Sequence, residues 1–105
     1  MEEPLFSLAL AEIFDSLLGS LPAKTRHAQQ RQRERDISDH AIIATLRWGR
    51  ALFRRDGRRE YELDMARTQI ARSCGEDVEP YVGTVVIVGS EGGVITVFRR
   101  SPALP

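Results

Sequence analysis

The pattern of apolar and polar positions divides this chain into an N-terminal helix, a polar segment and a compact body. From Leu5 to Leu21 apolar residues recur at helical spacing, with Gly19 and Pro22 as stop signals. We predict an amphipathic helical extension over residues 1–21 that packs on its own domain, on a second copy or on a partner protein. Residues 22–36 have no apolar period and read as a solvated polar linker or a polar extension of helix, within which His27 is a solvated side chain.

The body spans residues 37–100, with a tail over 101–105, and begins with a helix. Ser38 is a good N-cap, and Gly49 follows the last turn as a stop. On a helical wheel the core face consists of Ile42, Ile43 and Leu46.

Two short runs around Asp56 and Gly57 predict a hairpin whose register depends on the loop. A two-residue loop pairs Leu52 with Tyr61. A three-residue loop over Asp56–Arg58 pairs Phe53 with Tyr61, and we favour it because it gathers the apolar residues on one face.

A second helix is predicted from Asp64, as its cap, to Gly75, with Met65, Ile70 and Cys74 partly buried. The nearly continuous apolar runs 81–88 and 94–100 flank a S-E-G-G turn, so we expect a second hairpin that supplies the central strands. The order helix, hairpin, helix, hairpin predicts an α+β fold: a four-stranded, mostly antiparallel sheet with helices packed on it.

Composition narrows the class of protein. The formal net charge is zero, but the bases gather in the middle: residues 21–59 hold eleven bases against four acids. Cys74 is the single cysteine, which suits a reducing compartment, and the acidic start does not resemble a signal peptide. We therefore expect a cytoplasmic protein without a membrane partner.

Candidate chemistry centres on the first helix of the body. His40 and Arg47 share a ridge with Ala44 between them, where Ala44 would floor a groove. A histidine can move a proton near neutral pH and an arginine can hold a phosphate oxyanion, so the pair suits metal-free cleavage of RNA. Tyr61, Thr96 and Arg100 could position the phosphate, Arg100 because it alternates onto the sheet face of Thr96. Each of these residues also has a plain structural interpretation as a helix-start, snorkelling or sheet residue.

Other chemistries fit less well. The arginines of 54–59 resemble a nucleic-acid patch, but Glu60, Glu62 and Asp64 favour cross-strand ion pairing equally. Trp48 and Tyr61 could stack on bases, although both residue types more often fill a core boundary. The chain has neither a phosphate-binding glycine loop nor zinc-ligand spacing, so we expect no cofactor and no metal.

Several short motifs resemble a family of small bacterial domains of unknown function. They are S-D-H-A (38–41), W-G (48–49), G-R-R-E-Y-E-L-D (57–64) and G-V-I-T-V-F-R-R (93–100), and the resemblance covers about three-fifths of the chain. That family looks related to the toxin RNases of the barnase, EndoU, colicin and RelE type. In that comparison the helix histidine corresponds to His40 and the last-strand threonine to Thr96. Family members usually carry an arginine soon after the histidine, whereas the first arginine of this helix is Arg47.

Together these features predict a metal-free RNase-like toxin domain, or an inactive relative of one, with RNA as its partner. His40 would be the general acid/base, Arg47 and Arg100 would steady the phosphate, and Thr96 and Tyr61 would position it. The alternative is a non-catalytic interaction module in which Leu5 to Leu21 engages a partner protein or a second copy.

Overall fold

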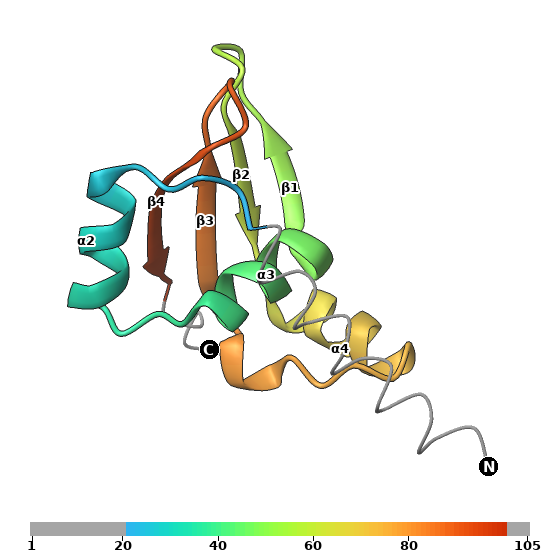
Figure 1. The fold of residues 1–105 in the computed structure, drawn as a ribbon. Helices are drawn as coiled ribbons and strands as arrows, with labels where there is room; N and C mark the ends of the chain where they lie inside the picture. The colour runs from blue at the N-terminus through green and yellow to red at the C-terminus, as the bar shows by residue number, and fades with distance from the viewer. Residues whose placement is uncertain (1–20, 101–105) are drawn as a thin grey trace.

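Four strands form one antiparallel sheet in the order β1-β2-β3-β4, which confirms the predicted α+β class (Figure 1). A computed structural model describes residues 21–100. The elements are α2 (Arg26–Glu34), α3 (Asp39–Trp48), β1 (Arg50–Phe53), β2 (Arg59–Glu62), α4 (Met65–Ser73), the short 3-10 helix η1 (Glu79–Tyr81), β3 (Thr84–Val88) and β4 (Val94–Arg99). Apart from Leu21, the predicted N-terminal helix lies outside the described residues, as does the tail.

Both helices predicted in the body are present and begin at the expected caps. The Ser38 hydroxyl accepts a hydrogen bond from the Ala41 amide at 3.1 Å, and the Asp64 carboxylate accepts one from the Arg67 amide at 2.7 Å. The buried face predicted for α4 was wrong. Met65, Ile70 and Cys74 are exposed, and Thr68 and Ala71 are the buried residues.

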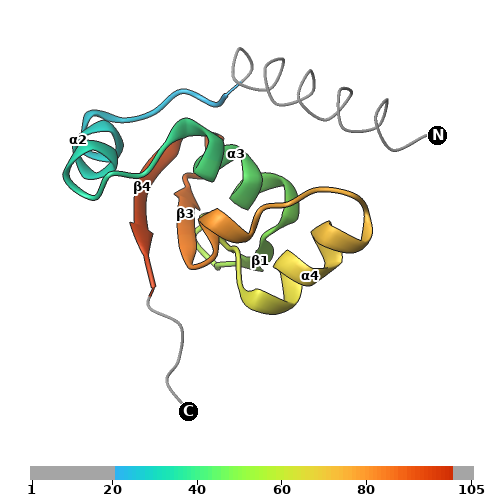
Figure 2. The same cartoon turned by 90° about the horizontal axis from the view of Figure 1, so that it is seen from below.

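Residues 22–36, predicted as a solvated linker or a polar extension of helix, contain the separate helix α2. Thr25 caps the helix by accepting from the Ala28 amide at 3.0 Å, and Ala28 is fully buried. Figure 2 shows α2 beside β4 at one edge of the sheet. Besides this buried alanine, the capping residues Thr25 and Arg35 bind α2 to β4 through hydrogen bonds to the Ile95 and Val97 carbonyls.

The sheet departs from the sequence predictions in two respects. β4 lies at an edge, so the central strands are β2 and β3. In the first hairpin Ala51 pairs with Tyr61 and Phe53 with Arg59, which neither predicted register gave. The tight turn closes earlier, where the Arg54 amide donates to the Arg58 carbonyl at 2.9 Å. This shift by two positions preserves the predicted sharing of one face by Phe53 and Tyr61.

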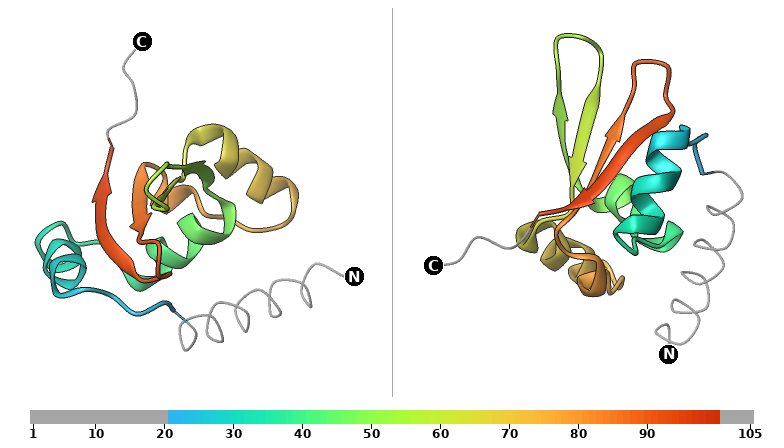
Figure 3. Two further views of the ribbon diagram at one scale, coloured as in Figure 1. Left: turned by 90° about the horizontal axis from the view of Figure 1, so that it is seen from above. Right: turned by 90° about the vertical axis from the view of Figure 1, so that its left-hand side faces the viewer.

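The main core lies between the sheet and helices α2 and α3. Its buried residues are Ala28, Ile37, Ala41, Ile42, Val86, Val88, Val94 and Val97. A second cluster joins α3 to α4 through Ala44, Leu63, Ala71 and Val78. None of the described helices lies over the upper part of the opposite sheet face (Figure 3). The sheet therefore packs against α2 and α3 on one face, whereas the upper part of the other face, which we call the open face, is not covered by a described helix.

Candidate nucleic-acid interface

The sheet separates the residues that the sequence predicted as one site. Val97 packs in the core with Ile42 of α3, so the helix of His40 covers the face of Val97. Thr96 alternates onto the opposite face, where it pairs with Ile87. His40 and Thr96 therefore lie on opposite sides of the sheet.

The expected groove between His40 and Arg47 is filled. Ala44, its supposed floor, is fully buried in the second cluster. The Arg47 guanidinium donates to the buried Glu76 carboxylate at 2.9 Å, and the Trp48 indole N–H donates to the same oxygen. Arg47 thus joins α3 to the segment after α4 rather than facing an open site.

Tyr61 is also on the packed face. It is partly buried against the main core, and Trp48 is partly buried against the second cluster. Both rings fill core boundaries, the plainer of the two interpretations that the sequence allowed.

Thr96 and Arg100 share the open face, four residues apart along the chain. Arg100 pairs with Glu62 of β2 and, at 3.6 Å, with Glu60, which confirms that it shares the face of Thr96. Its guanidinium carbon stands 5.5 Å from the centre of the Phe98 ring. The end of β4 therefore joins an aromatic ring to a guanidinium group.

A glycine sets the position of Arg100. The Arg100 amide donates to the Gly83 carbonyl at 2.7 Å. Gly83 has φ +92°, and a Cβ there would lie 2.6 Å from the Arg100 carbonyl oxygen. Only glycine allows these two backbones to approach so closely.

Helix α2 carries a histidine and an arginine that contact each other. The Arg31 Nε–H donates to His27 Nε2 at 3.5 Å. Arg31 also pairs with Glu34 at 3.0 Å. Hydrogen bonds from Gln30 and from Arg31 lower the pKa of Glu34 below its ordinary value. Arg31 is therefore shared between a carboxylate and an exposed imidazole.

The basic line of α2 continues onto β4. His27, Arg31 and Arg35 recur every four residues, and Arg35 lies roughly 12 Å beyond His27 along the helix axis. Arg35 donates to the Val97 carbonyl at 3.0 Å and, with Phe98 and Arg99, lines an open cavity of about 480 Å³. We call His27, Arg31, Arg35, Phe98 and Arg99 the α2–β4 surface.

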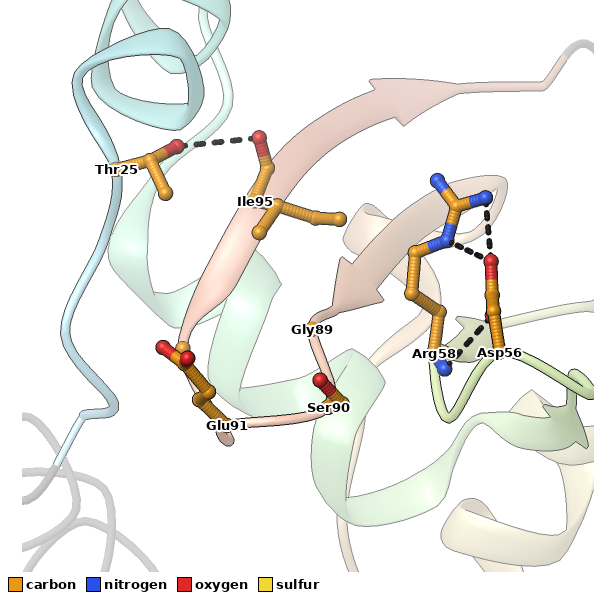
Figure 4. A pocket seen from close by; sticks show the side chains of 8 residues that line it. Thr25, Asp56, Arg58, Gly89, Ser90, Glu91 and Ile95 are labelled. Atoms are coloured by element: carbon orange, nitrogen blue, oxygen red, sulfur yellow. Dashed lines mark hydrogen bonds and ion pairs between the residues drawn. The ribbon is translucent and has the colours of Figure 1, made fainter.

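A second cavity of about 410 Å³ lies between the turns of the two hairpins (Figure 4). Its polar groups are largely satisfied by one another. Arg58 pairs with Asp56 at 2.7 Å, and the Thr25 hydroxyl donates to the Ile95 carbonyl at 3.2 Å. This cavity therefore offers less for a ligand than the α2–β4 surface does.

His27, Arg31 and Arg35 were not among the predicted site residues, because the polar composition of residues 22–36 is typical of a solvated segment. The sequence contains a pattern that would have found them: T-R-H-A at 25–28 repeats the capped S-D-H-A of 38–41. Both segments begin a helix with a hydroxyl cap and place a histidine two residues later. After T-R-H-A, Arg31 follows His27 by four residues.

Within residues 21–100, every helix is too short or too polar to span a bilayer. Comparison with known proteins leaves the resemblance to RNase toxins as a prediction. No protein-family model, no curated protein and no solved structure matches this chain.

Proposed function

We propose that this domain binds single-stranded RNA on the α2–β4 surface and cleaves its backbone without a metal, with His27 as the general base. The observation that carries the proposal is the contact between His27 and Arg31 on an exposed helix face that continues into a basic and aromatic cavity. The proposed site thus moves from His40 on α3 to His27 on α2.

The surface has the chemistry that unpaired RNA requires. Arg31, Arg35 and Arg99 can neutralise successive phosphates, and planar guanidinium groups suit bidentate contact with them. Phe98 offers a ring on which a base can stack, a contact that tolerates any base. Because Arg35, Phe98 and Arg99 line one cavity, a base and its phosphate can be held together there.

Cleavage would use the ribose 2′-hydroxyl as nucleophile. Once Arg31 leaves His27 Nε2 to contact the phosphate, Nε2 takes the hydroxyl proton while the 2′ oxygen forms a bond to phosphorus. Arg31 stabilises the charge that develops on the pentacoordinate phosphate. The bond from phosphorus to the 5′ oxygen breaks, and that oxygen takes a proton from water. The products are a 2′,3′-cyclic phosphate and a 5′-hydroxyl.

The resemblance noted above matches the family histidine to His40 and covers residues 37–100, so it assigns no role to His27, and the proposed site rests on the contacts of α2 and β4. Thr96 lies on the sheet face opposite His40, so the expected pairing of these two residues is not part of the proposed site.

The two histidines provide a matched test of cleavage. In buffer with a chelator, we expect wild-type protein and His40→Ala to convert an RNA oligonucleotide to products with a 2′,3′-cyclic phosphate, and His27→Ala to lose this activity. Equal activity of His27→Ala and wild type would overturn the catalytic assignment. A wild type that binds RNA without cleaving it would leave a non-catalytic RNA-binding domain.

Binding is tested separately with two exposed arginines. Arg99→Ala should weaken anisotropy-measured RNA binding and reduce the slope of log affinity against log salt by about one. Arg72→Ala is the control, because Arg72 pairs with Glu79 near the end of α4. Equal losses in the two variants would refute the α2–β4 surface as the RNA interface.

A further inference from the structure

Strand β1 is an edge strand whose outer side is unpaired among the described residues. Its inner side pairs with β2, beginning with the Arg54 amide that donates to the Arg58 carbonyl. Because hydrogen-bonded positions alternate along an antiparallel strand, Leu52 faces β2 while Ala51 and Phe53 present their N–H and C=O groups outward. All four residues of β1 are exposed.

The other edge of the sheet is covered. The Thr25 amide donates to the Val94 carbonyl at 3.0 Å, the Thr25 hydroxyl to the Ile95 carbonyl, and Arg35 to the Val97 carbonyl. The sheet therefore has one protected edge and one open edge, and an open edge is a template for another strand.

The open edge is apolar at its centre and basic at its ends. Phe53 is 72% exposed and Leu52 is 55% exposed, on opposite faces of the strand. Arg50 and Arg54 share the face of Leu52, one on each side of it. Their side chains are 61% and 48% exposed, although Arg50 pairs with Asp64 and Arg54 with Glu60.

These charges disfavour a second copy paired in the register centred on Leu52. A twofold pairing of β1 with itself about Leu52 would satisfy the outward groups of Ala51 and Phe53, but it would place Arg50 directly opposite Arg54 twice. An antiparallel strand with carboxylates at those two positions, and apolar residues at the three positions between them, has the complementary pattern.

We propose that β1 is a docking edge for an extended segment of another protein in which two acidic residues flank three apolar ones. The segment adds antiparallel to β1 as a fifth strand. Ala51 and Phe53 exchange backbone hydrogen bonds with it, Leu52 and Phe53 contact its apolar residues, and Arg50 and Arg54 pair with its carboxylates. This inference does not depend on RNA binding, which lies at the opposite edge.

The test uses the full chain and the synthetic peptide Gly-Ser-Glu-Val-Ile-Val-Glu-Ser-Gly. We expect saturable binding by anisotropy, and slower amide hydrogen exchange at Ala51 and Phe53 in the bound state. A peptide with both glutamates replaced by lysine is the matched control and should not bind measurably. Equal binding of the two peptides, or protection elsewhere than β1, would overturn the proposal.

A proline variant isolates the backbone contact. Ala51→Pro removes one outward N–H and leaves the ladder to β2 intact, so peptide affinity should fall by about tenfold while circular dichroism stays unchanged. Ala51→Val keeps the N–H and should bind like wild type. Should Ala51→Pro unfold, the exchange pattern of Ala51→Val with each peptide decides the question. Concentration-dependent protection of Ala51 without peptide would instead identify a second copy as the occupant and refute the acidic segment.

Discussion

The contact of Glu76 with Arg47 and Trp48 allows a quantitative prediction about stability. The Glu76 side chain is 1% exposed; one of its oxygens accepts two hydrogen bonds, while Oε1 is buried without a partner. Glu76→Ala removes both bonds and leaves the Trp48 N–H without its acceptor.

The magnitude follows from these contacts. Hydrogen bonds to a charged group contribute about 1.5–3 kcal/mol each. The lower value applies because the Arg47 side chain is 37% exposed and keeps water as an alternative partner. Removal of the unpartnered oxygen returns about 1 kcal/mol, so the net loss in free energy of unfolding is about 2 kcal/mol. Glu76→Gln keeps an acceptor for Trp48 and should lose about half as much.

Urea unfolding followed by far-ultraviolet circular dichroism measures these losses, with Trp48 fluorescence as a local probe. Arg47→Ala and the double variant complete a cycle that isolates the pair. A loss below about 0.5 kcal/mol for Glu76→Ala, the scatter typical of surface substitutions, would refute the assigned role. So would a Glu76→Gln variant as unstable as Glu76→Ala.

Three further predictions concern other contacts. Gly83→Ala should destabilise the protein by more than about 1 kcal/mol, because φ is positive there and the Cβ would strike the Arg100 backbone; a Tm equal to wild type would contradict this. Thr25→Val should lose about 1 kcal/mol with the cap of α2 and increase amide exchange in α2 but not in α4, whereas uniform exchange would argue against a local cap. Hydrogen bonds from Lys24 and then Gln32 lower the pKa of Asp39. The stability that ionised Asp39 contributes is therefore fully present above its unfolded pKa of about 3.9 and is lost as pH falls through its lower folded pKa. Asp39→Asn should reduce the dependence of Tm on pH below about pH 4. An unchanged dependence would refute this.

Capping predicted where α3 and α4 begin, because each cap lies next to the helix that it marks, but the apolar residues of α4 indicated the wrong buried face. They missed α2, whose packing rests on Ala28 and on polar bonds from Thr25 and Arg35 to β4. Those bonds join residues more than sixty positions apart, and a local pattern carries no trace of them.

The candidate site was harder to predict than the fold. The predicted site residues were selected by the chemistry of their side chains. Whether His40 and Thr96 lie close together depends on which face of the sheet α3 covers. Ile42 and Val97 share a core, and this places His40 and Thr96 on opposite sides. The partner of Arg47 is equally non-local, since Glu76 lies beyond an intervening hairpin and helix.

The bonds between α2 and β4 also affect how the chain folds during synthesis. Thr25 and Arg35 are made early, but the carbonyls that they contact belong to the last strand. Until residues 94–99 leave the ribosome, α2 has no strand to cover and the edge of β3 stays open. Pairing of β4 with β3 and covering of β4 by α2 would then occur together, late in synthesis. A truncation before β4 would leave the edge of β3 unpaired and the apolar sheet face under α2 exposed.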